Sequence, residues 1–254
     1  MVRPIIEVCV DTVESALAAQ AGGADRVELC DNLFEGGTTP SAGAMALARE
    51  RLQIKLHVII RPRGGDFLYS ELEFAIMRRD IEVTKELGAD GVVIGMLTAG
   101  GEIDQARTAQ LIELARPLSV TFHRAFDVTR DPFAALETLV ELGVDRVLTS
   151  GQEDSVAEGA ELIAELVRRA GERIIILPGG GFNERNLARI VQQTGVREVH
   201  VTGFANVESG MRYRNERVFM GGTLRLPEYT RAVTDAGAIK KLRERSLLAP
   251  YRKS

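Results

Sequence analysis

The chain has 254 residues, 45% of them hydrophobic, with a formal net charge of −4 and an isoelectric point near 5.6. This length suits one domain with a large core, and the acidic balance argues against nucleic acid and anionic membranes as partners. No run approaches the roughly 18 apolar residues of a membrane span, and the first residues lack the apolar stretch of a signal peptide. With two cysteines and no export signal, we expect free thiols in the reducing cytoplasm and a small ligand.

Strand-like and helix-like segments alternate along the whole chain. Short apolar or alternating runs predict strands at residues 5–10, 26–29, 56–60, 91–94, 119–122, 146–149, 174–177 and 198–201. Amphipathic runs with capping residues predict helices at residues 13–21, 41–51, 70–87, 104–115, 132–142, 155–170, 183–193 and 228–245. An alternation of this kind predicts a parallel sheet covered by helices.

A short return motif, Gly-(Ala/Val)-Asp, precedes the second, fourth and sixth predicted strands. It begins at Gly23, Gly88 and Gly143, and a variant begins at Gly195. Each glycine ends a helix, and the turn leads into the next parallel strand. Repetition on alternate units favours a closed barrel over an open, doubly wound sheet. The predicted fold class is therefore α/β, a single (β/α)8 barrel of the TIM type.

One domain is expected over residues 1–246, with a C-terminal tail at 247–254. The exception to the regular pattern is the segment 203–227, which has no clear periodicity and follows the last barrel strand. A long irregular segment at this end of a barrel is typically a lid or a subunit contact.

Two neighbouring strands carry the same Glu-x-Cys spacing. Glu7 and Cys9 lie two residues apart, as do Glu28 and Cys30, so all four are expected to point into the barrel. Adjacent strands lie about 4.8 Å apart, which allows the two thiols to sit side by side without a disulfide. The cysteines are then either small core residues or a two-thiolate site for a soft ion such as Cu(I).

Charged residues follow the third and fifth strands. The turn that begins at Arg61 and includes Arg63 offers guanidinium groups to an anion. His123, Arg124 and Asp127 follow the fifth strand and resemble an acid/base or anion-recognition group.

Two inward glutamates need partners, because a buried carboxylate is rarely tolerated alone. The expected partners are Arg61, Arg124 and His200. A third strand histidine, His57, lies early in its strand, where packing explains it equally well.

A glycine-rich turn follows the seventh strand. Gly179, Gly180 and Gly181 are consecutive, Thr202 and Gly203 follow the eighth strand, and Asn183 is expected to begin the next helix. The loops after these two strands bind phosphate in many barrels through backbone amides and a helix N-terminus. We therefore expect an anion site formed by these glycines and Thr202.

Several longer motifs occur in order along nearly the whole chain. They are Glu7-Val-Cys9, the segments 23–30, 35–41, 60–67, 121–127 and 148–151, and Met211-Arg-Tyr-Arg-Asn215. Together they resemble the CutC family. The resemblance implies a TIM-type barrel, a cytosolic homo-oligomer (a homodimer or homotetramer) and a role in copper homeostasis, with Cys9 and Cys30 as the copper ligands.

Two functional hypotheses follow. The first is a cytoplasmic protein that binds Cu(I) through Cys9 and Cys30. The alternative is an enzyme that acts on a small anionic substrate, phosphorylated or carbohydrate-like. Its candidate catalytic residues are Glu7, Glu28, Arg61, His123, Arg124, Asp127 and His200. The alternative predicts that Glu28, Arg61, His123 and Arg124 line one pocket, closed on one side by residues 211–215.

Overall fold

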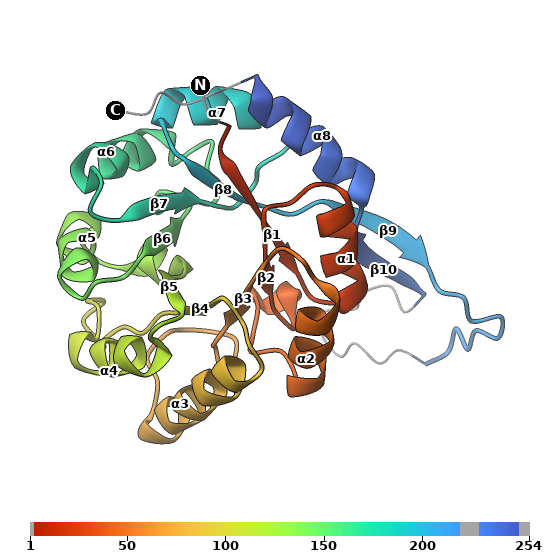
Figure 1. Cartoon of the computed structure of the whole chain (residues 1–254), viewed down its shortest axis with the longest axis horizontal. Coiled ribbons are helices and arrows are strands. Elements are labelled where there is room, and N and C mark those ends of the chain that lie inside the picture. Colours follow the sequence, from red (N-terminus) through yellow and green to blue (C-terminus); the bar gives the residue numbers. More distant parts are fainter. Residues whose placement is uncertain (1–2, 219–228, 249–254) are drawn as a thin grey trace.

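The computed structural model describes residues 3–218 and 229–248. Its main feature is a ring of eight parallel strands (Figure 1). These strands are β1 (Ile5–Val10), β2 (Arg26–Leu29), β3 (Lys55–Ile59), β4 (Gly91–Ile94), β5 (Ser119–Phe122), β6 (Arg146–Thr149), β7 (Ile175–Pro178) and β8 (Glu198–Val201). Each boundary lies within one residue of the sequence prediction.

Helices surround the ring on its outer side (Figure 1). They are α1 (Val13–Ala21), α2 (Ala42–Arg51), α3 (Glu71–Glu86), α4 (Gln105–Ala115), α5 (Pro132–Glu141), α6 (Ala160–Ala170), α7 (Leu187–Thr194) and α8 (Ala236–Leu247). Two short 3-10 turns, η1 (Leu33–Glu35) and η2 (Arg124–Val128), follow β2 and β5.

Strand pairing closes the ring. The hydrogen-bonded order runs from β7 through β6, β5, β4, β3, β2 and β1 to β8. A parallel bridge between Gly179 and His200 joins the two ends. The prediction of a single (β/α)8 barrel is confirmed, and the carboxyl ends of all eight strands therefore meet at one face.

Side-chain caps explain where several helices begin. The hydroxyl of Ser70 accepts a hydrogen bond from the Glu73 N–H, while the Glu73 carboxylate accepts one from the Ser70 N–H. Asp131 caps α5, whose first residue is Pro132. These groups satisfy amides that have no partner within the helix, so the helix starts are local properties of the sequence.

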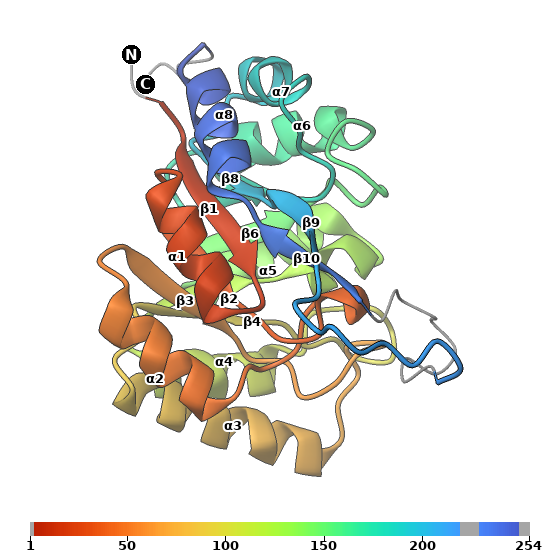
Figure 2. The same ribbon diagram turned by 90° about the vertical axis from the view of Figure 1, so that its right-hand side faces the viewer.

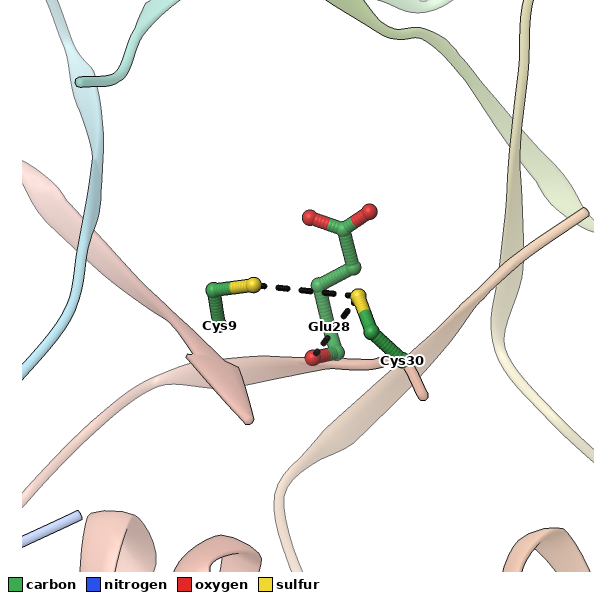
Figure 3. A group of neighbouring side chains, drawn as sticks. All are labelled: Cys9, Glu28 and Cys30. Atoms are coloured by element: carbon green, nitrogen blue, oxygen red, sulfur yellow. Dashed lines mark hydrogen bonds between the residues drawn. The ribbon is translucent and has the colours of Figure 1, made fainter. Parts of the chain in front are cut away.

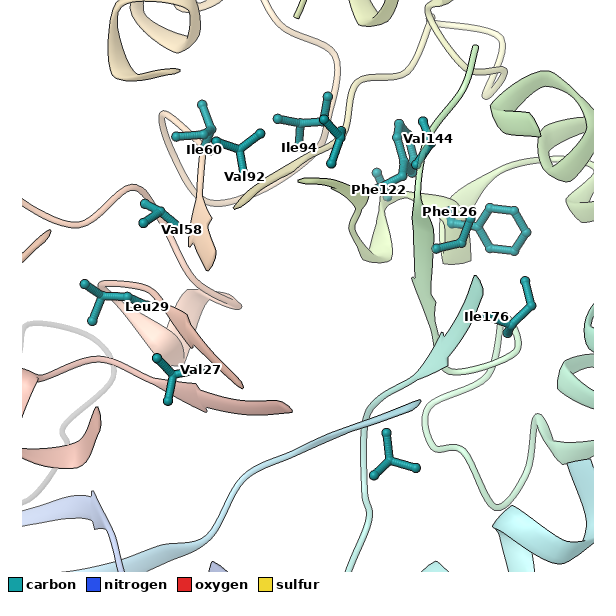
Figure 4. Close-up of a cluster of buried hydrophobic side chains, with 14 of the residues drawn as sticks. Val27, Leu29, Val58, Ile60, Val92, Ile94, Phe122, Phe126, Val144 and Ile176 are labelled. Carbon is teal, nitrogen blue, oxygen red and sulfur yellow. The ribbon is translucent and has the colours of Figure 1, made fainter. Parts of the chain in front are cut away.

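The main hydrophobic core lies between the strands and the helices. Figure 4 shows part of this layer, with Val58, Ile94 and Ile176 on the outer side of the ring. The inside of the barrel is different. A small separate cluster contains Cys9, Cys30, Ile59 and Val93, and ionisable side chains fill much of the remaining interior, as described below.

Three helices begin later than predicted, namely α6, α7 and α8, and the last is described in the next paragraph. α6 starts at Ala160 rather than at residue 155, and α7 at Leu187 rather than at Asn183. Gly159 packs so closely on the preceding loop that a Cβ there would lie 1.9 Å from the Ser150 carbonyl oxygen, which holds this segment in a turn. The side chain of Asn183 accepts hydrogen bonds from two following amides and forms a turn of its own.

The C-terminal region contains a hairpin that the sequence did not predict. β9 (Phe204–Glu208) pairs antiparallel with β10 (Thr230–Thr234), and the pair projects from the barrel beside α1 (Figures 1 and 2). Residues 204–208 are therefore not irregular, and the expected helix at 228–245 begins only at Ala236, capped by Asp235. Residues 219–228 of the predicted irregular segment and 249–254 of the predicted tail lie outside the described residues.

Candidate functional site

Two thiols meet at the carboxyl end of β1 and β2. The strand register places Cys9 beside Glu28, and Cys30 follows β2 directly. The two sulfur atoms lie 3.7 Å apart, both cysteines are buried, and neither is in a disulfide. Figure 3 shows the sulfurs facing one another across the strand pair. The predicted close, unbridged approach is confirmed.

Glu28 links the thiols to a second group of potential ligands. One of its carboxylate oxygens lies within 4.8 Å of both sulfurs, and the carboxyl group projects into the barrel (Figure 3). Glu28 also groups with Glu7 and His200 within the same limit. All four residues of the two Glu-x-Cys pairs therefore point inward, as the strand alternation predicted.

A buried ion-pair network lies beneath this cluster. The guanidinium of Arg26 binds the carboxylates of both Glu7 and Glu198. Arg146 binds Glu198 as well, at 3.2 Å, and donates to the Ser119 hydroxyl. These groups compensate one another's charges and fix the Glu7 carboxylate in place.

His200 connects the network to the thiols. Its Nδ1 lies 2.8 Å from Oε1 of Glu7 and 3.5 Å from Oε2 of Glu28. Burial alone lowers the pKa of His200, but hydrogen bonds with Cys9 and Glu7 and the nearby carboxylate of Glu28 raise it well above the ordinary value. These interactions favour the cationic form of the imidazole.

The environment separates the acidities of the two thiols. The hydrogen bond from Cys30, together with His200, outweighs burial and lowers the pKa of Cys9 to about 6. The same hydrogen bond and burial raise the pKa of Cys30. Burial and the charge of Cys9 raise the pKa of Glu28 to about 8. These shifts make Cys9 the more acidic of the two thiols, and they favour the protonated form of Glu28.

A cavity of about 310 Å³ opens above the thiols. Its lining comprises Cys9, Glu28, Cys30, Glu35, Gly36, Ile59, Arg61, Phe67, His123, Arg124, Asp127, Val128, Leu148 and His200. The four residues expected to share a pocket are all present. Residues 211–215 do not line it, and Met211 and Tyr213 are largely exposed. That part of the prediction is wrong.

Comparisons with known proteins agree with the geometry. The CutC family model matches residues 4–205. A CutC family protein from Bacteroides thetaiotaomicron is 55% identical over 231 residues, covering 91% of this chain and 93% of the relative. The human protein named copper homeostasis protein cutC homolog is 51% identical over 238 residues, covering 94% and 87% of the two chains. This chain belongs to the CutC family.

A solved structure supports the same assignment. A CutC crystal structure from Streptococcus agalactiae shares 39% identity and superposes with a TM-score of 0.75, covering 78% of this chain and 97% of the other. The barrel seen here is therefore the CutC fold. Among the described residues, no helix combines the length and apolar character that a membrane crossing requires.

The buried charges of the CutC barrel pair only partly as predicted, because His200 is a partner of both inward glutamates but the two expected arginines are not. The partners of Glu7 are Arg26 and His200, not Arg61 or Arg124. Arg124 instead binds Asp127 at 2.7 Å. His57 lies below the pocket, 3.7 Å from Glu7, and burial lowers its pKa to about 3, so it is a neutral packed residue.

Asp127 organises the loop after β6. Its carboxylate accepts hydrogen bonds from the amides of Ser150 and Gln152 and from the hydroxyls of Thr149 and Ser150, in addition to its pair with Arg124. A carboxylate with so many donors has little capacity left for acid/base work. Asp127 is better described as a positioning residue that holds Arg124 and the loop.

The glycine turn after β7 lies beside the pocket without lining it. Gly180 has a positive φ of 107°, and a Cβ there would lie 3.5 Å from Nη1 of Arg124. Thr202 and Gly203 are likewise absent from the lining. The helix expected to begin at Asn183 begins at Leu187. The anion site at this turn stays a prediction, without the helix N-terminus at Asn183.

Sequence reasoning missed Arg26, Arg146 and Glu198. The signal was present, because Arg26 precedes Glu28 by two residues and Glu198 precedes His200 by two. A period of two places Arg26 with Glu28, and Glu198 with His200, on the inward face of their strands. Which acid meets which base depends on the stagger between strands, which the alternation alone does not give.

Proposed function

We propose that this protein binds one Cu(I) ion as cargo through Cys9 and Cys30. The observation that carries the proposal is the pair of unbridged sulfurs 3.7 Å apart. Two sulfurs on one ion, with bonds of about 2.3 Å as at zinc, lie at most about 4.6 Å apart. The pair therefore fits one ion without movement of the backbone.

The donor chemistry fits a soft ion. Thiolates select Cu(I) among biological cations, and the ligand must be deprotonated to bind. Cys9 supplies a thiolate near neutral pH, and Cys30 would release its proton on binding. The imidazolium of His200 is positioned to balance part of the negative charge of the two thiolates.

The test is a competition titration of Cu(I) against a chromophoric chelator. The wild-type protein should bind one equivalent, and the double variant Cys9→Ser/Cys30→Ser should lose that binding. Met96→Leu is the matched control, since it removes a buried sulfur elsewhere in the core and should bind normally. A double variant that still binds one equivalent tightly would place the copper site elsewhere.

A second candidate function is an enzyme acting on a small anionic, phosphorylated or carbohydrate-like substrate. It is favoured by the cavity, where Glu28, Arg61, His123 and Arg124 meet beside the thiols. Perturbed acids and bases in a cavity are typical of active sites. A thermal-shift screen with Cu(I) and phosphorylated metabolites side by side compares the two functions directly.

We further propose that the protein works in the cytoplasm as a homodimer or homotetramer. A reducing compartment keeps the two thiols free. Large apolar side chains remain exposed on β9 and the segment after it, namely Phe204, Val207, Met211 and Tyr213. Large apolar side chains that remain exposed on a projecting hairpin often belong to a subunit contact. Light scattering after gel filtration gives the oligomeric state, and a monomer at micromolar concentration would contradict this proposal.

A further inference from the structure

Within the part of the chain that the structure describes, the guanidinium of Arg61 is a buried cation without a carboxylate partner. The residue is 5% exposed. Its Nη1 donates to the carbonyl oxygens of Glu35 and Gly37, both at 2.7 Å, and its Nη2 donates to the Gly65 carbonyl at 2.8 Å. Among the described residues its Nε–H makes no hydrogen bond of good geometry, and the side chain that interacts with the guanidinium here is the neutral hydroxyl of Tyr69. Carbonyl dipoles solvate such a charge without neutralising it, so the site retains a positive potential.

His123 offers a second unused donor to the same cavity. Its Nδ1 accepts a hydrogen bond from the Ala125 amide at 3.1 Å. In a neutral imidazole the proton must then sit on Nε2, and this buried Nε2 has no hydrogen-bond partner among residues 3–218 and 229–248. Burial, with the charge of Arg61, lowers the pKa of His123 to about 3, so the ring stays neutral in this tautomer.

One aromatic ring holds the two donors on the same side of the cavity. The Phe67 ring centroid lies 5.0 Å from that of His123 and 5.2 Å from Cζ of Arg61. Gly95 provides the space for the histidine, since a Cβ there would lie 2.4 Å from Nδ1. The packing therefore fixes the imidazole before any ligand arrives.

Two acidic residues of the cavity lining, Asp127 and Glu35, do not neutralise the charge of Arg61. Asp127 is paired with Arg124. Glu35 is exposed to water, and Arg61 bonds its main-chain oxygen; no ion pair to Arg61 forms within residues 3–218 and 229–248. Buried donors without acceptors are rare in folded proteins, and each calls for an explanation.

We propose that Arg61 and His123 form an oxyanion subsite, which binds a carboxylate or phosphate group of a small ligand through Nε–H of Arg61 and Nε2–H of His123. This inference assigns a ligand class to the cavity on which the second candidate function is based. It rests on that function in one respect only, namely that solutes can enter the cavity. It does not depend on copper. The subsite also differs from the glycine turn after β7, whose residues do not line the cavity.

The first test measures binding of three probes by calorimetry in a buffer free of carboxylate and phosphate. Inorganic phosphate and malonate carry the oxyanion, and malonamide is the neutral analogue. At least one anion should bind saturably and malonamide should not, and the two anions together show whether the subsite prefers phosphate or carboxylate. If neither anion binds saturably, the proposal is overturned.

Variants locate the binding. His123→Phe keeps a ring and removes the Nε2–H, and Arg61→Met removes the charge; each should weaken anion binding roughly tenfold or more. Arg63→Met is the control, because Arg63 is a partly exposed arginine of the same loop that pairs with Glu73, and it should stay within about twofold. Unchanged affinity in His123→Phe, or equal loss in the control, contradicts the assignment.

A spectroscopic measurement covers the case in which Arg61→Met fails to fold. In the wild-type protein, 15N imidazole spectra should show the Nε2–H tautomer of His123, and its resonances should shift when the anion is added. An Nδ1–H tautomer, or an insensitive resonance, contradicts the proposal. The Cys9→Ser/Cys30→Ser variant should lose copper binding and retain anion binding. Loss of copper binding alone therefore leaves this inference standing. Loss of anion binding in that variant would show that the subsite depends on the thiols, contrary to the proposal.

Discussion

Replacing Arg26 with methionine would remove the cation that holds two buried carboxylates inside the barrel. The side chains of Glu7 and Glu198 are 1% and 5% exposed, and that of Arg26 is 6% exposed. Breaking a buried ion pair by removing one partner costs about 3–5 kcal/mol, because the remaining charge is uncompensated. We expect a loss of this size, a large share of the roughly 5–15 kcal/mol that stabilises a typical domain.

The assay is urea denaturation at pH 7, with the midpoint and slope fitted separately. Arg173→Met is the matched control, since it breaks a bidentate pair with Glu137 whose side chains are 46% and 51% exposed. A solvent-exposed pair of this kind contributes at most about 1 kcal/mol. Arg26→Lys keeps the charge but not the fork of donors, so its loss of stability should be intermediate.

The pH dependence of the Arg26→Met effect has a definite sign. Burial raises the pKa of Glu7, but the charge of Arg26 and the hydrogen bond to His200 outweigh it and leave the pKa well below 4.5. A depressed carboxyl pKa contributes stability that is present above the unfolded-state pKa and lost as the pH falls through the folded-state pKa. The difference between wild type and Arg26→Met should therefore narrow in acid. A loss below 1 kcal/mol at pH 7, or a difference that widens in acid, would refute the reasoning.

Three further predictions concern single side chains. The thiolate absorbance of the Cys30→Ala variant should titrate at higher pH than that of the wild type, whose first thiol should titrate near pH 6, because the hydrogen bond from Cys30 is the largest cause of the lowered pKa of Cys9; equal midpoints would exclude this cause. Asp127→Asn should leave copper binding intact but destabilise the protein by about 1–3 kcal/mol in urea, since its donors lose a charged acceptor; no loss of stability would show that the loop is held otherwise. Ser70→Ala should cost about 1 kcal/mol through loss of the α3 capping box, and an unchanged urea midpoint would contradict the capping argument.

The positions where helices begin show which features can be predicted from a few consecutive residues. Ser41 and Ser70 cap α2 and α3 where the sequence placed them, because an N-cap depends only on a few consecutive residues. The starts of α6 and α8 were wrong. α6 is delayed by the close contact of Gly159 with Ser150, and α8 by the pairing of residues 230–234 with β9. Neither contact lies within the helix that it delays, and the strand pairing joins segments that are distant in the sequence.

The sequence by itself determined the barrel and the inward face of each strand. Side chains alternate with a period of two, so the Glu-x-Cys spacing in β1 and β2 was enough to place both thiols and both carboxylates inside. It also brought Arg61 and His123 to the same end of the barrel, because parallel strands share a carboxyl edge.

Only the tertiary structure decided which charges meet. Pairing of β1 with both β2 and β8 sets Glu7 beside Arg26 and His200, and no local pattern encodes that stagger. The same holds for the two unused donors of the cavity. Whether the Nε2–H of His123 finds an acceptor depends on every segment that packs around it, so a donor without a partner becomes visible only when the chain is folded.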